Sequence, residues 1–157
     1  MLPGVGPPLE LPDLPPNARL LEFLRGQASP PGGPDDYTLG SWQLHTHPDL
    51  MERLRELAPG WPLTAAYGVP LLAGEGIAAV VALGTGWLVV RIDHLPPGVQ
   101  SEDPAAGRWS AAGDDWHVVS PWPGQLPAAD GTRVLRDLVA AALAYAARLA
   151  GAGAAGS

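Results

Sequence analysis

The stretch from Leu63 to Asp93, LTAAYGVPLLAGEGIAAVVALGTGWLVVRID, constrains the fold of this chain more than any other part of the sequence. Two glycine-flanked turns, Gly74–Gly76 and Gly84–Gly86, divide it into runs of β-branched and small apolar residues. Glycine readily adopts the positive φ angles of tight hairpins, so these turns determine which strands are neighbours. The pattern predicts three antiparallel strands at Ala65–Leu72, Ile77–Leu83 and Trp87–Ile92.

The middle run, Ile77–Leu83, has no polar side chain on either face. A strand with one solvated face alternates apolar and polar residues, whereas a uniformly apolar strand is covered on both sides. We expect helices on one face of the sheet, and on the other face a short helix, a proline-rich arm or a second copy of the chain. A homodimer with Trp87 or residues of this middle run near its interface is therefore one expectation.

With 157 residues, 46% of them hydrophobic, the chain has room for one domain with one core. Its formal net charge is −7 and no segment gathers basic residues, so nucleic acid is not an expected partner. No apolar stretch reaches membrane-spanning length, and no positively charged start precedes an apolar run. We therefore expect a cytoplasmic protein without a membrane partner.

Residues 1–36 are predicted to form a proline-rich arm. Six prolines in residues 1–16 disfavour helix and interior strand and favour an extended segment on the surface. Asn17 is a good N-cap for a short helix at Ala18–Arg25, and the turn-rich residues 27–36 follow as a linker.

Residues 37–150 are predicted to form a single α+β domain. We expect an antiparallel β-meander of four to five strands, packed by an N-terminal helix pair and a long C-terminal helix. Residues 151–157 are expected to be a disordered tail. Besides the meander, the predicted elements are a strand at Tyr37–His45, a helix at Pro48–Ala58, a loop at 94–112, an edge strand at Trp116–Trp122 and a helix from Asp130 or Thr132 to Ala150.

This order of elements resembles the TfoX N-terminal/YjbR-like group of small α+β domains over residues 49–149. The resemblance rests on the leading helix PDLMERLRELA, the Tyr67-Gly68 pair, the Gly74/Gly76 turn, the LVVR end of the third strand at Leu88–Arg91 and the closing helix. This chain differs from the group by residues 1–48 and by its uncharged middle strand. The resemblance implies a regulatory or interaction module without an assigned catalytic set.

His45-Thr46-His47 is the sharpest local motif. Residues two apart on a strand point the same way, so both imidazoles could face one divalent metal such as zinc. Because the chain has no cysteine, the remaining ligand would be a carboxylate or another histidine. The candidates for that third ligand are Asp49, Asp93, His94 and His117.

The HTHP sequence is similar to the metal-binding stretch of the JAMM metalloproteases. In that family a serine and an aspartate follow at fixed offsets, where this chain has Arg55 and Ala58. The alternative interpretation is structural: Thr46, Pro48 and Asp49 open the following helix, and the histidines bond to the backbone.

His117 follows the acidic pair Asp114-Asp115, so an Asp–His pair for general acid–base chemistry is a second hypothesis. A histidine on the exposed face of an edge strand is the alternative. Neither Ser41 nor Ser120 lies in a nucleophile elbow.

Six tryptophans are many for a chain of this length, and several lie beside prolines. Core packing accounts for most of them, but tryptophans also serve amphipathic contact surfaces. The predicted contact surface contains Trp87, Trp116 and Trp122; the other tryptophans are Trp42, Trp61 and Trp109.

Two functions from different classes follow. The first is a non-catalytic interaction or regulatory module, with no cofactor, that binds a protein partner or itself. The second is a metal-dependent hydrolase that uses His45, His47 and Asp49.

Overall fold

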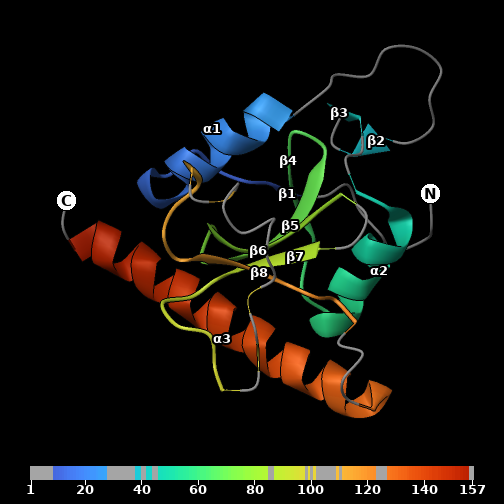
Figure 1. Ribbon diagram of the computed structural model, residues 1–157. Coiled ribbons are helices and arrows are strands. Elements are labelled where there is room, and N and C mark those ends of the chain that lie inside the picture. Colours follow the sequence, from blue (N-terminus) through green and yellow to red (C-terminus); the bar gives the residue numbers. More distant parts are fainter. Residues whose placement is uncertain are drawn as a thin grey trace.

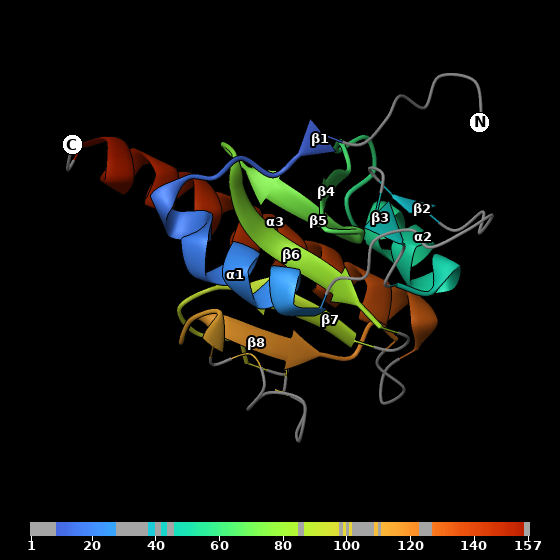
Figure 2. The same ribbon diagram turned by 90° about the horizontal axis from the view of Figure 1, so that it is seen from above.

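The computed structural model describes residues 9–27, 38–39, 42–43, 46–84, 87–97, 99, 101, 109, 111–122 and 127–155. They form a six-stranded sheet in the order β1-β4-β5-β6-β7-β8, with helices on both faces (Figures 1 and 2). The strands are β1 (Leu9–Glu10), β4 (Thr64–Ala66), β5 (Val69–Gly74), β6 (Ile77–Leu83), β7 (Trp87–Arg91) and β8 (Trp116–Val119). The predicted α+β class is confirmed.

The sheet has more strands than the sequence predicted. All neighbours are antiparallel except β1, which pairs parallel with β4 in the register Leu9↔Thr64. The arm therefore contributes an edge strand instead of only lying on the surface. Strand β8 forms the other edge, as predicted, although it ends at Val119.

The predicted strand Ala65–Leu72 is wrong because the chain reverses at Tyr67-Gly68. Tyr67 has φ 51° and Gly68 has φ 81°, the positive angles of a two-residue type I′ turn. Glu75 and Gly76, with φ 53° and 80°, make the same kind of turn between β5 and β6, which confirms the hairpin predicted there. Tyrosine rarely adopts positive φ, so the first turn carried no clear sequence signal.

A similar reversal replaces the predicted strand Tyr37–His45. Strands β2 (Thr38–Leu39) and β3 (Trp42–Gln43) pair antiparallel, with Leu39 opposite Trp42. The prediction of a single strand is therefore wrong, because the chain reverses between Leu39 and Trp42, where the sequence has a glycine. The linker at 28–37 lies outside the described residues.

The helices are α1 (Ala18–Gln27), α2 (Pro48–Leu57) and α3 (Ala128–Ala155). The first two match the predicted helices to within two residues. Helix α3 is longer than predicted at both ends, and its last five residues fall in the segment expected to be a disordered tail. Alanine is the strongest helix former and glycine costs only about 1 kcal/mol in a helix, so an alanine-rich segment can continue a helix through glycines.

Both faces of the central strand are covered by the chain itself. Helices α2 and α3 pack on one face, where Leu50, Leu54, Leu138 and Ala142 meet the strands. Helix α1, the arm and part of the 94–112 segment pack on the other face through Leu20, Leu24, Leu11 and Trp109. Residues Ala78–Ala82 are fully buried. They therefore offer no surface to a second copy, and the cover of the second face that the sequence left open is supplied by the chain itself.

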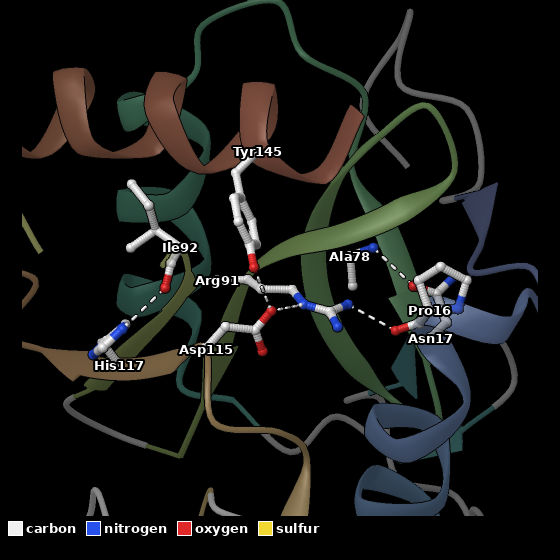
Figure 3. A network of polar contacts seen from close by, with 8 residues as sticks. All are labelled: Pro16, Asn17, Ala78, Arg91, Ile92, Asp115, His117 and Tyr145. Carbon is white, nitrogen blue, oxygen red and sulfur yellow. Dashed lines mark hydrogen bonds and ion pairs between the residues drawn. The ribbon is translucent and has the colours of Figure 1, made fainter. Parts of the chain in front are cut away.

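Asn17 does not cap α1. It ends a short 3-10 helix, η1 (Pro15–Asn17), and its side chain is fully buried. Its Nδ2 donates to Pro12 O and Gly76 O, both at 2.9 Å, and its Oδ1 accepts from the backbone N–H of Ala78 at 2.9 Å. The side chain fastens the arm to the β5–β6 hairpin, and Figure 3 shows its bond to Ala78.

Candidate functional site

The His45-Thr46-His47 motif lies where the chain enters α2. His45 is outside the described residues. Thr46 is buried and its Oγ1 donates to Ala82 O at 2.5 Å, while the His47 N–H donates to Gly84 O at 2.9 Å. These bonds attach the start of α2 to the end of β6.

His47 is the N-cap of α2. Its Nδ1 accepts a hydrogen bond from the Asp49 N–H at 3.1 Å, and Pro48 occupies the first turn. The structural interpretation of the motif thus holds for His47, although the capping side chain is the histidine and not Thr46. Asp49 lies nearby, with its Oδ2 3.9 Å from the same nitrogen.

The predicted metal ligands do not gather within the described part of the chain. No three His, Asp or Glu side chains among these residues are placed to hold one ion. Within the predicted set, His47 and Asp49 lie together, but no third described ligand joins them. An Nδ1 atom that accepts a backbone hydrogen bond is also unavailable to a metal unless that bond breaks.

The predicted Asp–His pair is wrong. His117 Nε2 lies 3.0 Å from the backbone oxygen of Ile92, the residue that follows β7 (Figure 3). Asp115 turns instead to Arg91 and Tyr145: its Oδ2 accepts from Arg91 Nε and from Tyr145 Oη, both at 2.9 Å. The carboxylate therefore has a cation and a phenol as partners, and the histidine bonds to the backbone.

This polar network joins distant parts of the fold. Arg91 on β7 also donates from Nη1 to Pro16 O at 2.7 Å, and its guanidinium lies 5.5 Å from the Trp116 ring centroid. Tyr145 reaches the same carboxylate from α3. Burial, then the hydrogen bond to Asp115 and that carboxylate's charge, raise the pKa of Tyr145 above its usual value. The contacts connect η1, β7, α3 and the start of β8, so the network stabilises the fold.

The tryptophans divide between core and surface. Trp109 lies 4.7 Å from Phe23 and 5.8 Å from Trp116, centroid to centroid, and Trp116 is only 5% exposed. Trp87 is half-buried against the same cluster. The prediction of Trp116 as a surface residue is therefore wrong, because it packs under α1. The Trp42 side chain lies outside what the structure describes.

Among the tryptophans whose side chains the structure describes, two are exposed, and they flank α2. Trp122, predicted to be on the surface, is 49% exposed, and the Arg53 guanidinium lies 6.0 Å from its ring centroid. Trp61 is 44% exposed and was not in the predicted contact set. Its Nε1 donates to Ala73 O at 3.0 Å, which fixes the indole against β5. A tryptophan in a Trp-Pro pair after a helix was the signal available for it.

Trp61 forms one wall of a groove of about 430 Å³, which we call the α3 groove. Helix α3 supplies the other wall through Arg136, Val139, Ala140, Leu143, Ala144 and Ala147. The end of α2 at Leu57–Pro59 and the turn residues Gly74 and Glu75 complete it. Apart from its two charged residues, the groove is lined by apolar and small side chains.

A second hollow of about 510 Å³ lies between the arm, α1 and the β4–β5 turn. Its charged lining residues are Glu10, Asp13, Glu22 and Arg25. All four side chains are exposed, so none is held in place by packing to define a ligand. The α3 groove is therefore the better-defined candidate.

Comparisons with protein-family models, with curated proteins and with solved structures gave no match. Among the helices that the structure describes, none combines the length and hydropathy needed to cross a bilayer, α3 included.

Proposed function

We propose that this chain is a non-catalytic protein-interaction module whose contact surface is the α3 groove. The observation that carries the proposal is the exposed indole of Trp61 beside an apolar groove. Large exposed aromatic side chains next to apolar hollows are characteristic of protein contact surfaces, where tryptophan is enriched among the residues that contribute most to binding.

The orientation of Trp61 supports this use. Because its Nε1 already donates to Ala73 O, the indole has no free polar atom and offers a partner only its ring. The same bond holds the ring in one position, so little side-chain entropy remains to be lost when a partner binds. A fixed apolar ring suits recognition of an apolar segment.

The roles of the other predicted groups also favour binding over catalysis. His47 caps α2, His117 bonds to a backbone oxygen, and Asp115 pairs with Arg91. Each group thus has a structural partner. A regulatory role, which the TfoX-like resemblance implies, would act through the same surface.

Site-specific photo-crosslinking in cells tests the proposal. A photoreactive amino acid at Ala144, inside the groove, should give a crosslinked species after irradiation, and Trp61→Ser should abolish it. The matched control position is Ala141, which is exposed on the same helix but does not line the groove. Equal crosslinking from both positions, or none from Ala144, would contradict a contact surface in the groove.

A further inference from the structure

The occupant of the α3 groove can be inferred from the arrangement of its charges, and this inference rests on the proposed function. Arg136, Ala140, Leu143 and Ala147 line the groove and are spaced four, three and four residues apart along α3. This spacing places them on one stripe of the helix. Ala140 and Ala144 are exposed on it, and side chains this small let a second helix approach closely.

The two charged residues of the groove lie at different levels of α3. Arg136 is on the helix itself, about 10 Å along the axis before Leu143 at 1.5 Å per residue. Glu75 is in the β5–β6 turn, directly after Gly74, whose missing Cβ would point at Leu143 O and Ala147 N. The groove therefore has a cation toward the N-terminal end of α3, and the turn that carries Glu75 lies beside Ala147.

Neither charge is neutralised by an ion pair within the described residues. Arg136 Nε donates to the backbone oxygen of Glu56 at 3.2 Å, which leaves its positive charge without a carboxylate partner there. No ion pair or hydrogen bond of the Glu75 side chain occurs in the same part of the chain. Both groups are available to an incoming partner.

We propose that the α3 groove binds a second copy of this chain, through antiparallel packing of α3 against α3 about a twofold axis between Ala140 and Leu143. In that pairing Ala140 meets Leu143 of the second copy, and Arg136 meets Ala147 of the second copy. Because the turn that carries Glu75 lies beside Ala147, Arg136 of each copy is brought to Glu75 of the other. A twofold axis makes the same contact twice, as an isologous interface requires.

This interface differs from the one that the sequence suggested. The sheet interior at Ala78–Ala82 is covered by the chain, and the side of α3 that lines the groove becomes the dimer surface instead. Trp61 lies on the groove wall, where it would pack against the helix of the second copy. An apolar centre with Trp61 and a rim that holds the two ion pairs has the anatomy of an ordinary protein interface.

Charge reversal tests the pairing. Arg136→Glu and Glu75→Arg should each place like charges together at two sites and raise the dimer dissociation constant by roughly 10- to 100-fold. Sedimentation or light scattering over a concentration series measures this constant. The double variant should dimerise again, because the two exchanged charges then face each other with opposite sign. Arg25→Glu and Glu22→Arg on α1, across the sheet, are the matched controls and should not change the constant.

Mixing the two single variants gives the decisive result. Arg136→Glu and Glu75→Arg should each be largely monomeric alone but form a heterodimer together, since one of its two contacts then joins the two introduced charges and the other joins the two original ones. Native mass spectrometry distinguishes the heterodimer by its mass. A wild-type chain that stays monomeric, or single variants that dimerise like wild type, would overturn the inference. A monomeric chain that still crosslinks another protein from Ala144 would refute self-association and leave the proposed function standing.

Discussion

Gly74 on β5 lies so close to Leu143 on α3 that a Cβ at the glycine would overlap the carbonyl oxygen of Leu143. The backbone N of Ala147 would be 3.5 Å from that added Cβ. Sheet and helix therefore touch backbone to backbone at this point, which is also the floor of the α3 groove. Only glycine permits this approach without moving the helix.

Gly74→Ala is expected to lower the free energy of unfolding by about 1–3 kcal/mol, because the added methyl meets backbone that cannot rotate away. Denaturant titration measures the change. Gly151→Ala on α3 is the matched control, since nothing lies within 4 Å of its added Cβ. That variant should be as stable as wild type or up to about 1 kcal/mol more stable. Equal stability of the two variants would show that the contact is looser than described.

Asn17→Ala is expected to destabilise the fold by about 2–4 kcal/mol, since it removes two donors and leaves the buried Ala78 N–H without its acceptor. Hydrogen exchange at the Ala78 amide should become faster than exchange at the neighbouring amides. Urea titration should show the matching loss in the free energy of unfolding. Glu22→Ala, at an exposed position of α1, should change stability by less than about 0.5 kcal/mol. A mild effect of Asn17→Ala, with slow exchange at Ala78, would mean that the arm is held mainly by its leucines.

The sequence predicted the elements that local patterns determine. The apolar run Ile77–Leu83 and the Gly74–Gly76 turn predicted the strand, its hairpin and its two-sided burial, and PDLMERLRELA predicted α2 to within one residue. It missed what distant contacts determine. Strand β1 has only two residues and exists because β4 offers it hydrogen bonds. Asn17 looked like a cap because the carbonyl oxygens that bind it come from elsewhere in the chain.

Tyr145→Phe is expected to cost about 1 kcal/mol at neutral pH through the lost hydrogen bond to Asp115. The pKa of Tyr145 is raised above 10.0, so the folded state keeps the phenol proton to higher pH than the unfolded chain. This contribution to stability is complete below pH 10.0 and is lost as pH rises through the pKa of the folded state. The stability difference between wild type and variant should therefore shrink in strong alkali.

Ultraviolet titration of tyrosinate can assign this behaviour, because one late-titrating component should disappear in Tyr145→Phe. Asp115→Asn is the matched variant: it keeps an oxygen acceptor but removes the negative charge, so the pKa of Tyr145 should fall. An unchanged tyrosine titration in Asp115→Asn would show that burial alone raises this pKa.

Less of the candidate site than of the fold could be predicted. Histidine and aspartate are common catalytic and metal-binding residues, so the sequence points to His47, His117 and Asp115, yet the hydrogen bonds of these side chains are structural. The α3 groove joins three segments that are distant in sequence, and its α3 wall has the same alanine composition as the rest of the helix. No local pattern shows which face of such a helix is left uncovered. Only the packing of α2 and the β5–β6 turn against α3 determines it.

Substitution of His47 separates capping from metal binding. Asparagine is at least as good an N-cap as histidine but a poor zinc ligand, whereas alanine can do neither. If His47 only caps α2, His47→Ala should lose about 1 kcal/mol and His47→Asn should be as stable as wild type. Elemental analysis of untagged protein should then find no stoichiometric metal, and added zinc should not raise the melting temperature.

A metal hydrolase would behave differently, because the purified protein would contain bound metal. His47→Asn would then lose the metal and the stability that it provides, and substitution of His45 would have the same effect. That outcome would overturn the proposed function, because the His45-Thr46-His47 motif would then bind a metal ion and would not only cap α2.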